Sequence, residues 1–354
     1  MHRYDQTNAE WYLDKSKRPL TSPQQTDREI EEIVKLTRLS LYNHDLFCGA
    51  QAILWELEEQ KAEPLPSLRT INRILNRNAL THRRTGRYEP KGTPYPTLQS
   101  GVPNFRHQAD FVGPRYLRGK TGSLRFYSMN VVDLSTGRCG TQPLFSRDGN
   151  AVYGAFWAIW GRLGLPRHLQ VDNEMVFYGS PTHPRGMGPL IRLCLYYGIE
   201  LWFIPQSEPW RNGVVEQFNN HYQQKFLNRV PMRTADELRK GALAFEQKHN
   251  SRYRYSKLNG KTPLEALAQS GKKPLRFPPN QSAPKTPLKK PGSGCYHLIR
   301  LIRSDCKLDI FGEYFRVSPD LQYEYVVATI DVKKQKLKLF HDQFQVDEFD
   351  YKLS

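Results

Sequence analysis

The stretch that most constrains this sequence is 209–220, Pro-Trp-Arg-Asn-Gly-Val-Val-Glu-Gln-Phe-Asn-Asn. After the turn signal Asn212-Gly213, apolar residues recur at helical spacing, namely Val215, Phe218, Tyr222 and Phe226. Polar residues fall on another face of the same helix, namely Glu216, Asn219, Asn220 and Gln223. The pattern predicts a helix that carries the carboxylate of Glu216 in its first turn.

Two earlier acids stand at strand-like runs. Asp110 lies in the apolar and aromatic run 105–112, which Gly113-Pro114 closes, and this reads as a strand. Asp172 ends a second run, 169–172. One acid inside a strand, one at a strand end and one at a helix start can converge on a single point. Three carboxylates there form a site of oxygen ligands, which suits Mg²⁺.

These segments resemble the Asp-Asp-Glu core of bacterial insertion-sequence transposases with a retroviral-integrase-type catalytic core. The similarity runs over about residues 20–250. It implies an RNase H-like fold on which Asp110, Asp172 and Glu216 are the catalytic residues and hold two Mg²⁺ ions, with Mn²⁺ as a substitute. It also implies that the chain binds the terminal repeats of a mobile element, cleaves the 3′ ends and transfers them into target DNA.

The spacing of the last two acids departs from the family pattern. Between Asp172 and Glu216 lie 43 residues, against about 35 in the commonest form of the motif. The extra residues are expected in the loop 178–189, which Gly and Pro punctuate. An insertion in this loop need not move either acid.

Composition favours a polyanionic partner. The 354 residues include 52 Lys and Arg against 35 Asp and Glu, a net charge of +17, whose attraction for double-stranded DNA would fall steeply with salt. A basic but otherwise ordinary soluble protein is the alternative. Five scattered cysteines argue against a disulfide framework or zinc ribbon. No apolar stretch reaches membrane-spanning length and no signal peptide is visible, so a soluble, intracellular protein is expected. The family resemblance further implies a bacterial cytoplasmic, nucleoid-associated location.

The N-terminal part predicts DNA recognition. Residues 1–25 read as a basic arm, and residues 26–82 as three helices, the first opened by a capping box at Thr26-Asp27-Arg28-Glu29. The third helix presents a polar and basic face with Arg69, Thr70, Asn72, Arg73 and Arg77. This arrangement is typical of a helix-turn-helix domain. A small bundle with a solvated basic face is the alternative.

Two basic linkers are expected. Residues 83–104 contain Arg83, Arg84 and Arg87 among several prolines, and this segment could lie along DNA or act as a spacer. Residues 251–295 form a Pro-rich linker with Lys272, Lys273, Lys289 and Lys290, and no acid occurs between Glu265 and Asp305. The absence of counter-charges favours a strap on duplex DNA over a flexible tether.

The remaining segments complete a multidomain fold class. In the core, residues 105–250, strands are expected at 105–112, 124–133, 138–145, 167–172 and 200–204, with helices at 150–163, 189–197 and after 213. This order agrees with the mixed α/β sheet of an RNase H-like domain. Residues 296–354 alternate in short runs and predict a small C-terminal β-barrel. The N-terminal α-helical helix-turn-helix is the third domain.

Other roles and other functions remain open. Asn173, Asn220 and Gln223 could orient phosphate or a metal-bound water, although such residues on a helix face usually only solvate it. One alternative function is a catalytically inactive DNA-binding regulator or transposase remnant, and another is an RNase H-type nuclease. The family resemblance further implies a homo-oligomer on paired DNA ends, with an ATP-using target-selection protein as a candidate partner.

Overall fold

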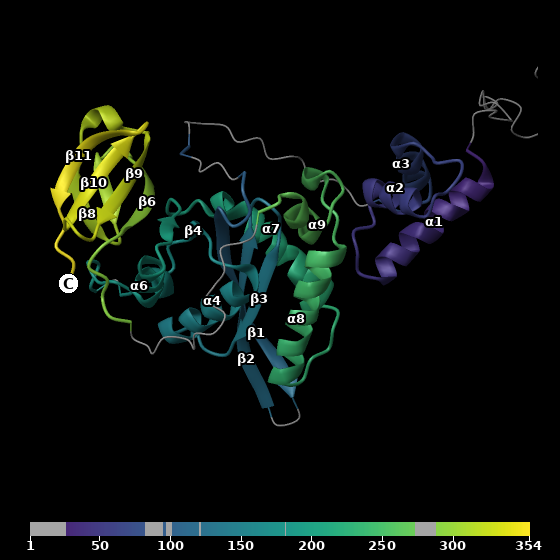
Figure 1. Ribbon diagram of the computed structural model, residues 1–354, viewed down its shortest axis with the longest axis horizontal. Coiled ribbons are helices and arrows are strands. Elements are labelled where there is room, and N and C mark those ends of the chain that lie inside the picture. Colours follow the sequence, from purple (N-terminus) through teal and green to yellow (C-terminus); the bar gives the residue numbers. More distant parts are fainter. Residues whose placement is uncertain (1–25, 82–94, 97–100, 120–121, 181, 273–287) are drawn as a thin grey trace, which may run out of the picture. The chain divides into compact units, whose positions relative to one another are not determined.

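The computed structural model describes residues 26–81, 95–96, 101–119, 122–180, 182–272 and 288–354. It divides the chain into two compact units, Met1–Arg84 and Thr85–Ser354 (Figure 1). The predicted arm, 1–25, lies outside the described residues, as do Arg83, Arg84, Arg87 and Lys273. None of the described helices is long and apolar enough to cross a membrane.

The first unit contains the three predicted helices. They are α1 (Arg28–Asn43), α2 (Ala50–Glu59) and α3 (Leu68–Arg77), and they bury a core that includes Val34, Ile53, Leu57, Ile71 and Ile74. The predicted capping box at Thr26 is wrong. Asp27 is the N-cap instead, because its side chain accepts from the backbone N–H of Glu29. Thr26 lies one residue too early to cap this turn.

The second unit begins with a mixed α/β region. Its elements are β1 (Arg106–Gly119), β2 (Gly122–Asp133), β3 (Cys139–Leu144), α4 (Gly149–Leu163), β4 (His168–Val171), α5 (Met175–Tyr178), α6 (Pro189–Tyr196), β5 (Glu200–Phe203), α7 (Gly213–Tyr222), α8 (Ala235–Arg252) and α9 (Pro263–Gln269). A 3₁₀ turn (Pro209–Asn212) precedes α7, and a π-helical segment (Gln223–Leu227) continues it. The core strands and helices predicted from the sequence are all present.

The C-terminal part is rich in β-strands. These are β6 (Cys295–Leu301), β7 (Lys307–Ile310), β8 (Glu313–Arg316), β9 (Tyr325–Asp331), β10 (Lys336–His341) and β11 (Phe344–Asp350). Four of them extend the core sheet, since the strands follow one another in the order β11-β10-β9-β6-β5-β4-β1-β2-β3. Strands β7 and β8 form a separate hairpin. The predicted β-rich character is confirmed, whereas closure into a barrel stays a prediction.

Strand directions give the sheet its mixed character. β1 pairs antiparallel with β2, and β2 with β3, whereas β1, β4 and β5 run parallel to one another. β6 also joins β5 in parallel, with Leu201 opposite Tyr296. The region from β5 to β3 is the mixed sheet expected of an RNase H-like core, so that prediction is confirmed.

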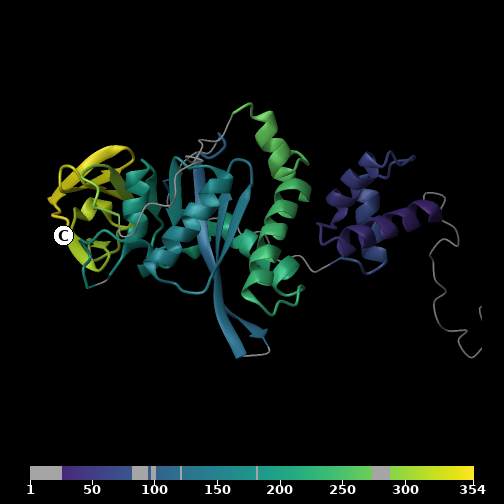
Figure 2. The same ribbon diagram turned by 60° about the horizontal axis from the view of Figure 1, so that its bottom comes forward.

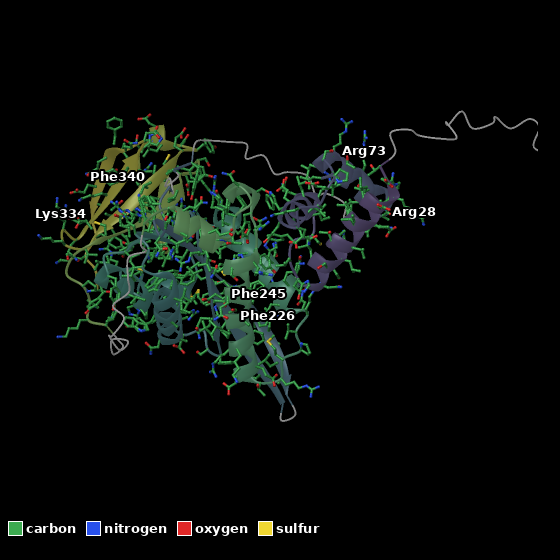
Figure 3. The ribbon with its side chains drawn as sticks, turned by 45° about the vertical axis from the view of Figure 1, so that its right-hand side comes forward. Arg28, Arg73, Phe226, Phe245, Lys334 and Phe340 are labelled. Atoms are coloured by element: carbon green, nitrogen blue, oxygen red, sulfur yellow. The ribbon has the colours of Figure 1, made fainter. Side chains whose placement is uncertain are left out.

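Helices cover both faces of this sheet (Figures 1 and 2). On one face α4 packs so closely on β3 that a Cβ at Gly140 would lie 2.5 Å from Cγ2 of Ile159, which leaves room only for glycine. On the other face α7 and the π-helical segment after it meet α8 through aromatic rings. Among these are Phe226 of the π-helical segment and Phe245 of α8, whose ring centroids are 5.9 Å apart (Figure 3). The core therefore has three layers.

Helix α8 also covers the edge of the sheet at β3. Asn250 accepts from the backbone N–H of Cys139 at 2.8 Å and donates to its carbonyl at 2.9 Å. Glu246 accepts from the backbone N–H of Thr141 and forms an ion pair with Arg162 of α4. Side chains of α8 thus take the bonds that a further strand would make.

Strand β1 does not end where the sequence suggested. The expectation that Gly113-Pro114 closes it is wrong, because pairing with β2 resumes at Arg115 after a register shift and continues to Gly119. Gly113 adopts φ +126, and Pro114 has no N–H to donate to a ladder. The pair therefore forms a bulge, and the β1–β2 ribbon runs on beyond it (Figure 2).

The segment predicted as the linker 251–295 is partly helical. α8 reaches Arg252, and α9 begins at a capping box in which Thr262 and Glu265 exchange bonds with each other's backbone N–H. The prediction of an extended chain is therefore wrong over α9, because Pro263 occupies the first helical position, where its missing N–H costs nothing. Residues 273–287 lie outside the described part.

Candidate active site

Three elements position the three predicted acids. Asp110 lies on β1 in the same alternation as Gln108, opposite Asn130 of β2. Asp172 follows directly after β4, the parallel neighbour of β1. Glu216 lies in the first turn of α7. The two strands are adjacent and α7 packs on β1 and β2, so the fold brings the three carboxyl groups to one region of the sheet.

Asp110 is held by two hydrogen bonds. Its Oδ1 accepts from the backbone N–H of Phe111 at 2.8 Å, and its Oδ2 accepts from Nδ2 of Asn219 at 2.8 Å. Burial raises the pKa of Asp110 to about 7, and the negative charges of Asp172 and Glu216 add to the rise. Both acids therefore act on Asp110 electrostatically, as groups that share one site do.

The other two acids are also held in a poorly solvated environment. Burial raises the pKa of Asp172 to about 6, and the guanidinium of Arg147 opposes this rise. Burial raises the pKa of Glu216 as well. An uncompensated buried carboxylate is costly, and a cation at this point would offset the cost for all three groups.

The donor set suits a hard divalent cation. All three side chains offer carboxylate oxygens, which Mg²⁺ prefers. Within the described residues no three His, Cys, Asp or Glu side chains form a preassembled metal-binding group. The three acids interact electrostatically in this structure without being gathered around one point.

A clamp of amide side chains, not foreseen from the sequence, fixes the start of α7. Gln108 of β1 and Gln170 of β4 lie opposite each other in the parallel ladder. Both donate to the carbonyl of Arg211, at 3.3 and 2.9 Å, and Gln170 also donates to the side chain of Asn212 at 3.0 Å. Gln108 in turn accepts from the backbone N–H of Val215 at 3.2 Å. The strands that carry Asp110 and Asp172 thus hold the helix that carries Glu216.

Asn212 has a different role from the one its sequence context suggested. It was read as part of an Asn-Gly turn, yet it is only 2 % exposed and donates to the carbonyl of Ala109 at 3.0 Å. Gly213 adopts ordinary helical angles, with φ −57 and ψ −24. Asn212 is therefore buried, and its side chain links the start of α7 to β1 by a hydrogen bond. In the sequence, only its amide group beside a glycine could have indicated this role.

The accessory residues predicted around the site have other contacts. Asn173 donates to the carbonyl of Ile204 at 2.6 Å and accepts from Arg300 at 2.8 Å. Asn220 is exposed, and Gln223 accepts from Arg115 at 3.3 Å. The amide that bonds to one of the three predicted acids is instead that of Asn219, which donates to Asp110 and accepts from Asn130 of β2 at 2.7 Å. A helical step of three residues from Glu216 is the signal that could have identified it.

The loop before α7 is also bonded to the C-terminal strands. Arg211 pairs with Glu208 at 2.9 Å, and both contact the hydroxyl of Tyr325 in β9. The guanidinium of Arg211 also stacks on the ring of Tyr95, 3.7 Å from its centroid. Neither Arg211 nor Glu208 is free in this structure, so both stabilise the loop that leads to Glu216.

The predicted DNA contacts that can be located lie at the surface. On α3, Arg69, Arg73 and Arg77 are all exposed, and Figure 3 labels Arg73. Arg77 also pairs with Glu31 of α1. Thr70 bonds to Ser67, and Asn72 donates to the carbonyl of Leu68. In the second unit Lys272, Lys289 and Lys290 are exposed, and Lys290 also contacts the backbone oxygen of Ser354. Arg69 and Arg73 are the two α3 arginines without an ion pair among the described residues.

Comparisons with known proteins bear on the part of the chain that carries Glu216. Residues 197–263 match the family model described as the integrase core domain. No curated protein matches the chain.

Similar solved structures include the HTLV-2 integrase catalytic core domain in complex with magnesium, in its trimeric form. It is 19 % identical, covers 48 % of this chain and 99 % of its own, and has a TM-score of 0.37. A chain of the simian T-cell lymphotropic virus intasome in complex with PP2A regulatory subunit B56 gamma is 15 % identical. The match covers 90 % of this chain and 96 % of that chain, with a TM-score of 0.40. The BIV integrase catalytic core domain is 16 % identical. The match covers 48 % of this chain and 96 % of that chain, with a TM-score of 0.34. The family-model match shows that residues 197–263, which include the Glu216 helix, are similar to the integrase core domain.

Proposed function

We propose that this chain is a DNA transposase of the Asp-Asp-Glu type, which cleaves the 3′ ends of a mobile element and joins them to target DNA. One observation carries the proposal: the negative charges of Asp172, at the end of β4, and of Glu216, in the first turn of α7, raise the pKa of Asp110 in β1. The integrase-core match over residues 197–263 supports it, because this segment contains Glu216.

The chemistry assigned to the site is phosphodiester hydrolysis followed by transesterification. A water oxygen attacks the phosphorus, the bond from phosphorus to the 3′ oxygen breaks, and this oxygen leaves as the 3′-hydroxyl of the element. The hydroxyl then loses its proton and attacks a phosphorus of the target strand, where the bond to the target's own 3′ oxygen breaks and that oxygen leaves as a hydroxyl. Two Mg²⁺ ions, when bound, would activate the attacking oxygen and stabilise the leaving one. Asp110, Asp172 and Glu216 would hold them.

The neighbouring side chains keep the acids in position. Asn219 orients the carboxylate of Asp110 through its bond to Oδ2, and the clamp of Gln108 and Gln170 fixes α7 against the two strands. On this proposal the exposed Arg69 and Arg73 of α3 belong to a helix-turn-helix that binds the terminal repeat. The exposed Lys272, Lys289 and Lys290 contact phosphates.

Strand transfer by the purified chain tests the proposal. The substrates are a labelled duplex with the terminal repeat of the element that encodes the chain, and a plasmid target, with Mg²⁺ present. The matched variant is Glu216→Gln, which keeps the shape of the side chain and removes its charge. We expect joining by the wild type, none by the variant and equal DNA binding by both.

Two other outcomes would change the assignment. If the wild type binds the repeat but neither nicks nor joins with Mg²⁺ or Mn²⁺, the DNA-binding regulator becomes the better reading. If it cleaves RNA–DNA hybrids in preference to duplex DNA, an RNase H-type nuclease does.

A further inference from the structure

An open groove of about 680 Å³ lies directly beside Asp172. Asn173 and Glu174, the two residues that follow this acid, form one part of its lining, and Arg125, Tyr127 and Arg147 contribute another. Tyr127 and Arg125 belong to β2, whereas Arg147 lies just before α4. The groove therefore joins the end of β4 to a wall with two cationic side chains.

Aromatic rings hold both guanidinium groups in place. The Arg147 guanidinium lies 4.8 Å from the ring centroid of Phe111 and 5.4 Å from that of Tyr127. The Arg125 guanidinium lies 5.1 Å from the centroid of Tyr127 and donates to its hydroxyl. Phe111 directly follows Asp110 in β1. A stacked guanidinium is held in orientation, so it can donate N–H bonds to phosphate oxygens with little loss of side-chain entropy.

Arg125 and Arg147 have few acidic partners among the described residues. Arg147 forms an ion pair with Glu174, on the other side of the groove. Among the residues that the structure describes, Arg125 is paired with no carboxylate. Three acids nearby would repel a polyanionic strand, so a strand that reaches Asp172 needs compensating cations along its path. The two arginines stand where that compensation is required.

We propose that Arg125 and Arg147 bind phosphates of the DNA strand that enters the site beside Asp172, and that a phosphate replaces Glu174 as the partner of Arg147. The inference rests on the proposed function for the identity of the strand. Glu174 keeps Arg147 aligned in the free protein and competes with DNA for it. The two members of one ion pair therefore affect DNA binding in opposite directions.

Fluorescence anisotropy tests this with the full chain, a fluorescein-labelled 30-base-pair duplex of arbitrary sequence, and EDTA so that no cleavage occurs. Arg147→Gln and Arg125→Gln should each weaken binding about five-fold at 100 mM salt and lower the slope of log K against log salt by about 0.9, the loss of one phosphate contact. Glu174→Gln should tighten binding about three-fold, since it frees the Arg147 guanidinium.

Matched controls come from a second ion pair on α8. Arg239 pairs with Asp236 at 2.9 Å and stacks on Phe145 at 5.0 Å, so it has the same kinds of contact outside the groove. Arg239→Gln and Asp236→Asn make the same changes in net charge and should leave the salt slope unchanged. Thermal unfolding should show a loss for both variants and a larger one for Arg147→Gln, because this variant also removes the contacts of the guanidinium with the Phe111 and Tyr127 rings.

The result that overturns the proposal is a Glu174→Gln variant that binds DNA more weakly, as Arg147→Gln does, because the pair would then be purely structural. Salt slopes of the groove variants that equal those of the α8 controls would overturn it too. Failure of the proposed function is distinguishable, because it appears as absent Mg²⁺-dependent joining by the wild type, whereas the opposite effects of Arg147 and Glu174 are read without catalysis.

Discussion

Replacing Asp110 by Asn should stabilise the fold while it abolishes catalysis. Burial and two neighbouring acids raise the pKa of Asp110 from 3.8 to about 7. A shift of about three pKa units corresponds to about 4 kcal/mol of folding free energy that the ionised group costs above pH 7. An asparagine keeps one acceptor oxygen and loses the other, at a cost of about 1 kcal/mol. The net gain at pH 8 is then about 3 kcal/mol.

The sign of the pH dependence follows from linkage. Between pH 3.8 and about 7 the unfolded carboxyl is ionised while the folded one keeps its proton, so wild-type stability falls as the pH rises through this window. Above pH 7 the full penalty is present. At pH 5 only about 1.2 units have accumulated, which is about 1.6 kcal/mol. The advantage of Asp110→Asn should therefore be large at pH 8 and close to nil at pH 5.

Differential scanning calorimetry with EDTA measures this directly. A gain of 3 kcal/mol in a unit of this size raises Tm by roughly 5–10 °C. Asp236→Asn is the matched control, because the side chain of Asp236 is 80 % exposed and its removal should change Tm little. A Tm at pH 8 that is equal to or below the wild type, or a gain that does not shrink at pH 5, would refute the burial argument.

Three other changes give separate tests. Mg²⁺ affinity should fall from pH 8 to pH 6, because the carboxyl groups of Asp110 and Asp172, with pKa values of about 7 and 6, must lose their protons to bind; calorimetry in buffers of different ionisation enthalpy should detect the released protons. Gln170→Leu removes one arm of the clamp and should lower kcat by about 10- to 100-fold with KM nearly unchanged, and equal loss in kcat and affinity would contradict this. Glu246→Ala removes the partner of Arg162 and the acceptor of the Thr141 N–H and should cost about 1–3 kcal/mol in chemical unfolding, whereas a cost well below 1 kcal/mol would show that these contacts are dispensable.

Local patterns were sufficient to predict most of the core. The strand ending at Val171 and the helix of Val215 and Phe218 could be predicted because alternation and 3.6-residue spacing are visible in a short window. The positions of the three acids followed from these elements. The loop after α5 closes on itself through the bond from Gly188 N–H to the Tyr178 carbonyl. That the extra residues of the 43-residue spacing lie in this loop stays a prediction.

What could not be predicted depends on pairing between distant segments. Gln108 and Gln170 meet only because β1 and β4 run parallel in one particular register, which no single window reveals. Asn212 looked like a turn residue because its burial depends on the strand beneath it. Gly113-Pro114 looked like a strand end because glycine and proline are common both in turns and in β-bulges. Which of the two forms depends on whether the partner strand continues to pair beyond them.

The parallel pairing of β5 with β6 has a consequence for folding order. Leu201 and Tyr296 lie 95 positions apart in the chain. Closing so long a loop costs conformational entropy, which is offset only once the core sheet has formed and can pair with β6. The C-terminal strands should therefore dock late, on an edge that β5 already presents. A chain that stops after α9 would leave that edge with a row of unpaired N–H and C=O groups, and we expect it to self-associate even though each of its core elements is intact.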